Sequence, residues 1–181
     1  MAVPGREVHP SPAGVPGGGM TVLPEALYRG MAEALPILCV DVILRNRKGD
    51  YLLLKRVNEP KKGRWWPVGG RVRKGESLPA AAIRKVKEET GLSTRALQPV
   101  GYFEHHGRRG PLGIDTGYHS VSVVFLASVG DRKTVVLDGQ SSAWKYAEKL
   151  PADFRVVTFP GAGSRIPVRQ GGMLHPRSES P

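Results

Sequence analysis

The residues with the clearest chemical potential lie between Gly70 and Leu92. A loop at the start of this stretch carries Glu76, and the segment after it ends with the adjacent acids Glu88 and Glu89. Carboxylate oxygens are ligands that hard divalent cations prefer in proteins. The stretch is therefore a candidate cation site, provided that the chain after the loop forms one element that positions the acids.

A helix is predicted from Ser77 to Thr90. Ser77 is a suitable N-cap, and Gly91 suits the left-handed position that ends a helix. At about 100° per residue, Glu89 lies at the edge of the apolar stripe, whereas Glu88 lies on the outer side. An acid at the edge of a core is costly unless another group compensates it, and a divalent cation would do so. Glu89 is thus the favoured ligand, and Glu88 is either a further ligand or a solvated helix acid.

The same helix also allows a purely structural interpretation. Arg84 with Glu88, and Lys85 with Glu89, are spaced four residues apart and could form salt bridges along the helix. The preceding loop and the glycine that ends the helix favour the metal site over this alternative.

The whole stretch resembles the Nudix box, GX5EX7REUXEEXGU, in which U is an aliphatic residue. Every fixed position matches except one, because Lys85 stands where the family has glutamate. The resemblance implies an α/β fold, the α/β/α Nudix sandwich with a mixed sheet, and a hydrolase that uses Mg²⁺, or Mn²⁺ in its place, to cleave a nucleoside-diphosphate compound. Because a lysine competes with metal, we infer one cation rather than a cluster, with Glu76 orienting Arg84 instead of binding metal.

Outside the box, residues 35–146 are similar in order and spacing to the GDP-mannose mannosyl hydrolase branch of the family. That branch breaks the sugar C–O bond, and one cation stabilises the leaving diphosphate. The resemblance implies that the substrate is contacted by Asp41, Arg56, Arg71 and Trp65, with Trp66 packed beside the site. It implies that the metal is held by the Gly69 carbonyl, Glu89 and Gln140, to which the helix adds Glu88. It implies catalytic roles for Arg84, His106 and His119.

One position departs from that branch. Its general-base histidine directly follows the metal-binding glutamine, but here Ser141 follows Gln140. A serine hydroxyl is a poor general base at neutral pH. Either another group takes the role, for which His119, His106 and Asp115 are candidates, or the chemistry differs.

Three functions are consistent with these residues. The first is Mg²⁺-dependent hydrolysis of GDP-mannose to GDP and mannose by attack on the anomeric carbon. The second is cleavage of a P–O–P anhydride in a dNTP or ADP-ribose, which Ser141 and the retained Glu88 favour. The third is a weakly catalytic nucleotide- or RNA-binding domain, which Lys85 and the basic charge permit.

The composition indicates one folded domain. The chain has 181 residues, 40% of them hydrophobic, and a formal net charge of +11, which favours anionic partners. The Pro/Gly-rich residues 1–19 are expected to be a disordered leader, residues 20–160 the Nudix domain, and residues 161–181 a disordered basic tail. The single Cys39 excludes an intramolecular disulfide and is expected to be buried.

The remaining expectations concern partners and secondary structure. No apolar run is long enough to span a membrane, so we expect no membrane partner. The single cysteine favours a reducing cytoplasmic location. A nucleotide or nucleotide sugar is the favoured partner, nucleic acid is less favoured, and the family resemblance suggests a homodimer. Strands are expected at 37–45, 51–56, 66–68, 97–104, 120–128 and 143–146, with a short helical turn at 148–154.

Overall fold

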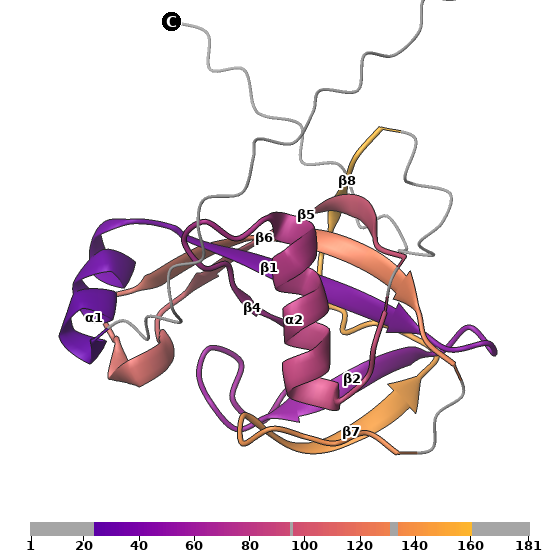
Figure 1. Ribbon diagram of the computed structural model, residues 1–181. Coiled ribbons are helices and arrows are strands. Elements are labelled where there is room, and N and C mark those ends of the chain that lie inside the picture. The colour runs from indigo at the N-terminus through magenta and orange to yellow at the C-terminus, as the bar shows by residue number, and fades with distance from the viewer. Residues whose placement is uncertain (1–23, 95, 131–133, 161–181) are drawn as a thin grey trace, which may run out of the picture.

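The structure, a computed structural model, describes residues 24–160 except 95 and 131–133 (Figure 1). The leader and tail expected at residues 1–19 and 161–181 therefore lie outside the described residues. In chain order the elements are α1 (Glu25–Ala34), β1 (Ile37–Arg45), β2 (Tyr51–Arg56), β3 (Trp65–Trp66), β4 (Val68–Arg71), α2 (Leu78–Thr90), β5 (Gln98–Gly107), the 3-10 helix η1 (Pro111–Gly113), β6 (Tyr118–Ser128), β7 (Ser141–Ala147) and β8 (Val157–Thr158).

The strands form one mixed sheet with β1 near its centre. The order is β3-β2-β1-β6-β5-β8, while β4 pairs with β1 and β7 pairs with β2. β1 and β6 run parallel over the whole length of β1, and the other pairs are antiparallel. The α/β class and the mixed sheet expected from the sequence are confirmed.

One predicted strand is divided in two. The segment expected at 66–68 forms β3 and β4, which lie on either side of Pro67. Proline has no backbone N–H to donate to a sheet ladder. The chain accordingly changes partner there, from β2 before the proline to β1 after it.

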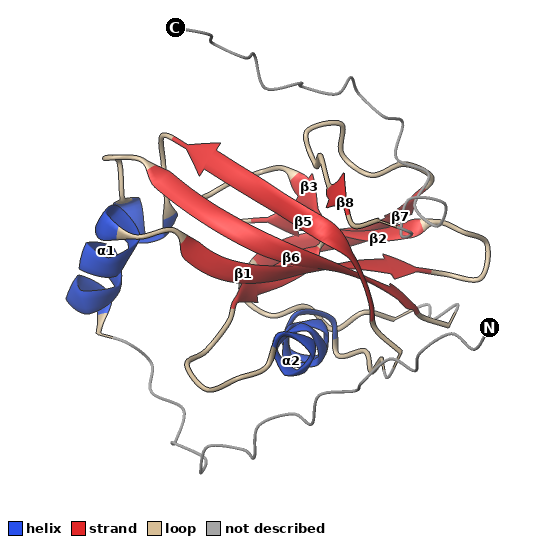
Figure 2. Ribbon diagram, turned by 90° about the horizontal axis from the view of Figure 1, so that it is seen from above, coloured by secondary structure: helices blue, strands red, loops and turns tan. Residues whose placement is uncertain are grey.

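Helix α2 covers one face of the sheet (Figures 1 and 2). Its N-cap is Ser77, whose side chain accepts a hydrogen bond from the backbone N–H of Ala80 at 3.3 Å, and it ends at Gly91 with φ of 68°. The predicted start and end of the helix are confirmed. Alternate residues of β1 pack against the apolar side of α2 in one buried cluster. Its members from β1 and α2 include Val40, Val42, Leu44, Ala82 and Val86.

The opposite face is packed by aromatic side chains. Trp66 lies 5.7 Å from Phe103 and 5.2 Å from Phe154 between ring centroids. Phe154 comes from the segment after β7. The prediction of a helical turn at 148–154 is wrong, because the chain forms bends and a turn there. In that turn the backbone N–H of Phe154 donates to the Pro151 carbonyl at 2.9 Å. Pro151 cannot donate the hydrogen bond that a helix would need there.

Helix α1 was not predicted from the sequence. It is ten residues long, carries Gly30 in its interior and has no side-chain cap at its start, so its local signals are weak. Tyr28 and Ala32 are buried in the same small cluster as Cys39, whose expected burial is confirmed. No helix in the described part of the chain is long and apolar enough to cross a membrane.

Candidate active site

The loop after β4 is fastened to α2 by an arginine. Arg84 contacts both carboxylate oxygens of Glu76, through Nε at 2.7 Å and Nη2 at 2.8 Å, and Nη2 also donates to the Arg71 carbonyl at 3.0 Å. The Arg84 hydrogen bond holds the pKa of Glu76 below its ordinary value. Glu76 thus acts as the orienting partner of Arg84, and the loop is fixed relative to the helix.

Glu89 is the buried acid of the site, with 5% of its surface exposed. Its Oε1 lies 2.6 Å from Lys85 Nζ, and its Oε2 accepts a hydrogen bond from the Gly69 backbone N–H at 3.3 Å. Burial raises the pKa of Glu89, and the Lys85 ammonium is the strongest group that acts in the other direction. The helix therefore presents Glu89 to the double glycine of β4, as its place on the helical wheel suggested.

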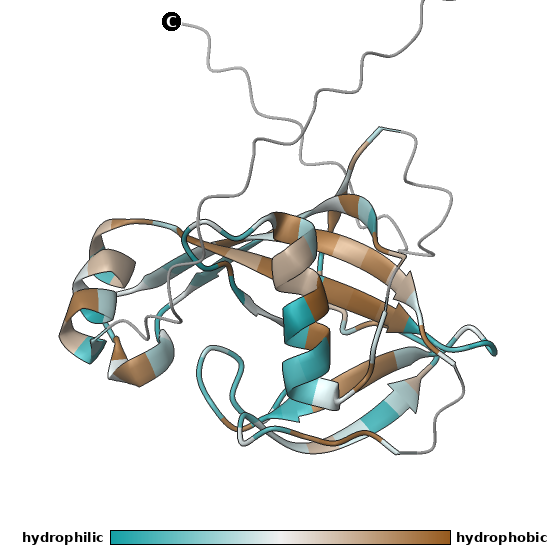
Figure 3. Ribbon diagram, in the orientation of Figure 1, coloured by the Kyte–Doolittle hydropathy of each residue, from teal (hydrophilic) through white to brown (hydrophobic). Residues whose placement is uncertain are grey.

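Glu88 is surrounded by cations instead of by protein core. Its carboxylate oxygens lie 3.2 Å from Arg73, 3.1 Å from Arg84 and 3.4 Å from Lys85, and about a third of the side chain, 37%, is exposed. Both salt bridges of the structural interpretation, Arg84–Glu88 and Lys85–Glu89, are therefore present. Figure 3 shows that these polar residues occupy the second half of α2, whereas its first half is apolar.

The two glycines of β4 allow charged side chains to approach from both faces of the strand. A Cβ at Gly69 would overlap Asp41 Oδ1, and one at Gly70 would lie 2.7 Å from Lys85 Cε. Gly69 is the direct neighbour of Asp41 in the β1–β4 ladder. Any larger residue would displace either Asp41 on one face or the lysine that pairs with Glu89 on the other.

Gln140 lies in the loop before β7, which comes near Glu89 through Asp138. Asp138 is close enough for its charge to raise the pKa of Glu89. Its two carboxylate oxygens accept hydrogen bonds of 3.0 Å from the backbone N–H and the side-chain Nε2 of Gln140. Sequence reasoning missed Asp138; its only local signal is the Asp-Gly-Gln turn, in which an aspartate commonly accepts a bond from the residue two places on.

The donor chemistry around Glu89 fits a hard divalent cation. Glu89 bonds to the backbone of Gly69, and the Gln140 side chain bonds to Asp138, whose charge acts on Glu89. A carboxylate, a backbone carbonyl and a side-chain amide oxygen from Glu89, Gly69 and Gln140 would suit Mg²⁺ or Mn²⁺. Within the part of the chain that the structure describes, no three His, Cys, Asp or Glu side chains are grouped to hold a metal by themselves. A cation here would thus rely on one buried carboxylate together with neutral oxygens.

A second group of charged residues lies across β4 from α2. Asp41 is 7% exposed, and burial raises its pKa to about 6, against a hydrogen bond with Ser122 and the charge of Arg56. Burial and the nearby charges of Lys61, His106 and Arg56 hold the pKa of His105 below its ordinary value. Since side chains alternate along strands, His105 lies on the same face as Asp41. Sequence reasoning left His105 without a role.

His106 and His119 lie on the other face, the one that α2 covers. They are direct partners in the β5–β6 ladder, and their rings stack with centroids 4.2 Å apart. His106 is exposed, with 68% of its side chain accessible, whereas Nε2 of His119 is buried and has no hydrogen-bond partner among the described residues. The structure thus brings these two predicted histidines together but separates them from Asp41.

The remaining predicted contacts lie at different places. The Arg71 guanidinium lies 4.0 Å from the centre of the Tyr28 ring. Trp65 is half-buried, with Lys145 Nζ 4.5 Å from its ring, while Trp66 belongs to the core. Asp115 lines a surface hollow of about 510 Å³ with Arg108 and Arg109, and that hollow includes no residue of the Glu89 cluster.

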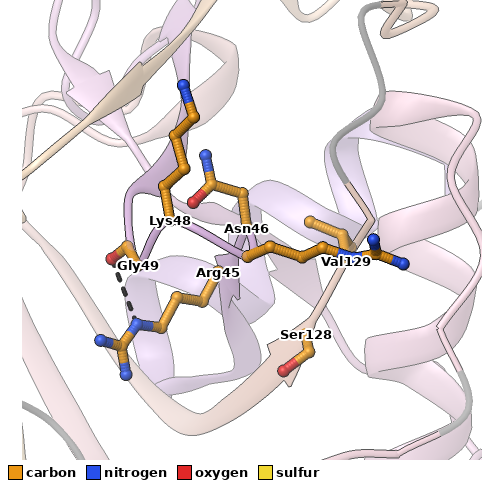
Figure 4. Close-up of a pocket in the computed structure, with 7 residues that line it drawn as sticks. Arg45, Asn46, Lys48, Gly49, Ser128 and Val129 are labelled. Atoms are coloured by element: carbon orange, nitrogen blue, oxygen red, sulfur yellow. Dashed lines mark hydrogen bonds between the residues drawn. The ribbon is translucent and has the colours of Figure 1, made fainter.

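A second hollow, of about 350 Å³, lies at the β1–β2 turn. Figure 4 shows that Arg45 and Lys48 extend in different directions from it, and Arg45 Nε donates to the Gly49 carbonyl at 3.1 Å. Arg45 and Lys48 therefore do not converge on one ligand in this hollow.

Comparison with known proteins identifies the family of the chain. A NUDIX domain family model matches residues 35–154. The chain is 32% identical over 129 residues to the low-salt glycan biosynthesis protein Agl8 of Haloferax volcanii, a match covering 71% of this chain and 81% of Agl8. It is 35% identical over 94 residues to an ADP-ribose pyrophosphatase of Methanocaldococcus jannaschii, a match that spans only 52% of that relative and 52% of this chain.

A solved structure gives the same result for the fold. The MutT protein of Methanosarcina mazei Go1 superposes with a TM-score of 0.53 and 27% sequence identity. The match covers 66% of this chain and 88% of the MutT protein.

Proposed function

The chain belongs to the Nudix family of hydrolases, and we propose that its substrate is a nucleoside-diphosphate sugar of the GDP-mannose type. The observation that carries the proposal is the buried Lys85–Glu89 ion pair, with 2.6 Å between Nζ and Oε1. A lysine among the acids reduces the number of cations that the site needs. One cation suits attack on the sugar carbon, where its task is limited to the leaving diphosphate.

Specific residues would hold that cation and the substrate. Glu89, the Gly69 carbonyl and the amide oxygen of Gln140 would be its ligands, whereas Glu88 is already engaged by three protein cations. The bound Mg²⁺ would neutralise and orient the diphosphate. In this proposal Arg84, Arg71 and Arg56 supply further positive charge to the phosphates, while Asp41 and Trp65 contact the nucleotide sugar.

The general base is assigned on geometry because Ser141 cannot take the role. His105 shares a face with Asp41 and lies near the charge of Arg56, and burial lowers its pKa, which favours the neutral ring that accepts a proton. It joins His106, His119 and Asp115, the candidates from the sequence. If His105→Gln loses turnover while substitutions at the other three candidates keep it, His105 is the general base.

A second function is favoured by other observations. Ser141 and the retained Glu88 are consistent with cleavage of a P–O–P anhydride, and one relative is named an ADP-ribose pyrophosphatase. A weakly catalytic nucleotide- or RNA-binding domain, consistent with the net charge of +11, is the third candidate. A homodimer and a cytoplasmic location remain predictions from the sequence.

The deciding experiment is a Mg²⁺-dependent product assay in ¹⁸O-labelled water with GDP-mannose, ADP-ribose and dGTP. The proposal expects label in free mannose and none in GDP, and Glu89→Gln should lower turnover at least about a thousandfold without unfolding the protein. Label in a phosphate product would assign the anhydride chemistry instead. Full activity of Glu89→Gln would remove Glu89 from the metal site.

A further inference from the structure

We propose that the Lys85 ammonium is a built-in cation of this site, which holds Glu88 and Glu89 in place of a second divalent metal and orders Glu89 before any metal binds. The inference rests on the proposed function in assuming that one divalent cation binds at Glu89. It goes further by giving Lys85 a positioning role: the lysine sets how many metals the site admits.

The first support is the way Lys85 is buried. Its side chain is 8% exposed, yet Nζ lies 2.6 Å from Glu89 and 3.4 Å from Glu88. A buried ammonium is costly unless it is paired, and here it bridges two neighbouring acids. Lys85 therefore lies where a cation shared by the two carboxylates would lie.

The second support is the space that β4 leaves for the lysine stem. A Cβ at Gly70 would lie 2.7 Å from Cε of Lys85 and 3.3 Å from its Cδ and Nζ. The Lys85 stem thus crosses the β4 backbone at a glycine, which has no Cβ to obstruct it. A larger residue at position 70 would displace the stem that carries the ammonium to Glu89.

The third support is the charge of the whole network. Its ion pairs join three carboxylates and three cations, namely Glu76, Glu88 and Glu89 with Arg73, Arg84 and Lys85. The network is neutral as it stands. A glutamate at position 85 would give it a charge of −2, which is the charge that one divalent cation neutralises.

The test is a Mn²⁺ titration of the full chain, followed by calorimetry and by the electron paramagnetic resonance signal of free Mn²⁺. We expect the wild type to bind one Mn²⁺ and Lys85→Glu to bind two. Lys87→Glu is the matched control, because it makes the same charge change on the exposed side of the same helix, and its stoichiometry should equal that of the wild type. The same number of bound ions in Lys85→Glu as in the wild type would overturn the inference.

A second variant covers the case in which Lys85→Glu folds poorly. Lys85→Gln keeps a polar side chain, one atom shorter than that of lysine, but removes the ammonium, so Glu89 should depend on metal for its order. Mg²⁺ should raise the Tm of Lys85→Gln by about 5 °C more than that of the wild type. Equal shifts in the two proteins would contradict the role of Lys85.

These readouts separate the inference from the proposed function. If the wild type binds no Mn²⁺ but Lys85→Glu binds one, Lys85 occupies a cation position and the metal-dependent function fails. If both bind one ion and the wild type hydrolyses a nucleotide sugar, the function stands and the inference about Lys85 is wrong.

Discussion

Two buried acids lie against the opposite faces of β4, Glu89 from α2 and Asp41 from β1, and their settings differ. On the α2 face, Glu89 is 5% exposed and has Lys85 at 2.6 Å, within a network that contains three cations. On the opposite face, Asp41 is 7% exposed, and the groups that favour its charged form are the Ser122 hydroxyl and the more distant charge of Arg56. The acids are similarly buried but differ in what compensates the charge.

The difference shows that two carboxylates packed against the same strand can have different properties. An ion pair fixes the position of Glu89, as a metal ligand requires. Burial outweighs the Ser122 hydroxyl and the charge of Arg56 and raises the pKa of Asp41 to about 6, so that the group is close to gaining a proton near neutral pH. A group in that state suits hydrogen bonding or proton exchange with a substrate better than it suits metal binding.

Removing Lys85 should have the largest effect on stability, because it takes away the group that distinguishes the setting of Glu89 from that of Asp41. Lys85→Met leaves Glu89 buried without its ammonium partner, and loss of one partner of a buried pair typically costs about 3–5 kcal/mol. We expect the free energy of unfolding in urea at pH 7.5 to fall by about 3 kcal/mol. The double variant Lys85→Met/Glu89→Gln should recover much of this loss, because the uncompensated charge is gone; additive losses would mean that the pair is not coupled.

Neutralising Asp41 should have a smaller effect of the opposite sign. Its raised pKa means that between about pH 4 and pH 6 the folded protein holds a proton that the unfolded chain has released, so stability falls as the pH rises through this window. Asp41→Asn removes that loss. We expect it to raise the free energy of unfolding by about 2 kcal/mol at pH 8 and by little at pH 4.

The control for that prediction is Ser122→Ala, which removes the hydroxyl but keeps the carboxylate. This variant should be less stable than the wild type at pH 8, and the deficit should shrink at pH 4. A stability difference for Asp41→Asn that does not change with pH would show that the carboxylate is not what destabilises the protein at high pH.

Breaking an exposed ion pair should have the smallest effect on the free energy of unfolding. Asp153 lies 2.7 Å from Lys61 and 3.3 Å from Arg64, but its side chain is 37% exposed and that of Arg64 is 60% exposed. We expect Asp153→Asn to cost less than about 1 kcal/mol at low salt, and less still in 1 M NaCl, by urea unfolding. A loss as large as that of Lys85→Met would mean that burial does not explain the contrast.

The predictable part of the site is the part encoded in short stretches of sequence. The helix ends at Ser77 and Gly91, and the spacing of four residues between Lys85 and Glu89, depend on neighbouring residues alone. Helix α1 was missed because its interior glycine and uncapped start give no such local signal. The turn expected at 148–154 was overestimated for a related reason, since Pro151 interrupts the helical hydrogen bonds.

The sequence by itself determined the family, the loop-helix motif and the presence of a lysine among its acids. Only the tertiary structure decided which groups face one another: Asp41 against Gly69, Asp138 near Glu89, and His105 rather than His106 on the Asp41 face. The physical reason is that these neighbours come from distant segments. The register of strand pairing assigns every side chain to one face or the other, and a shift of one residue would exchange His105 and His106.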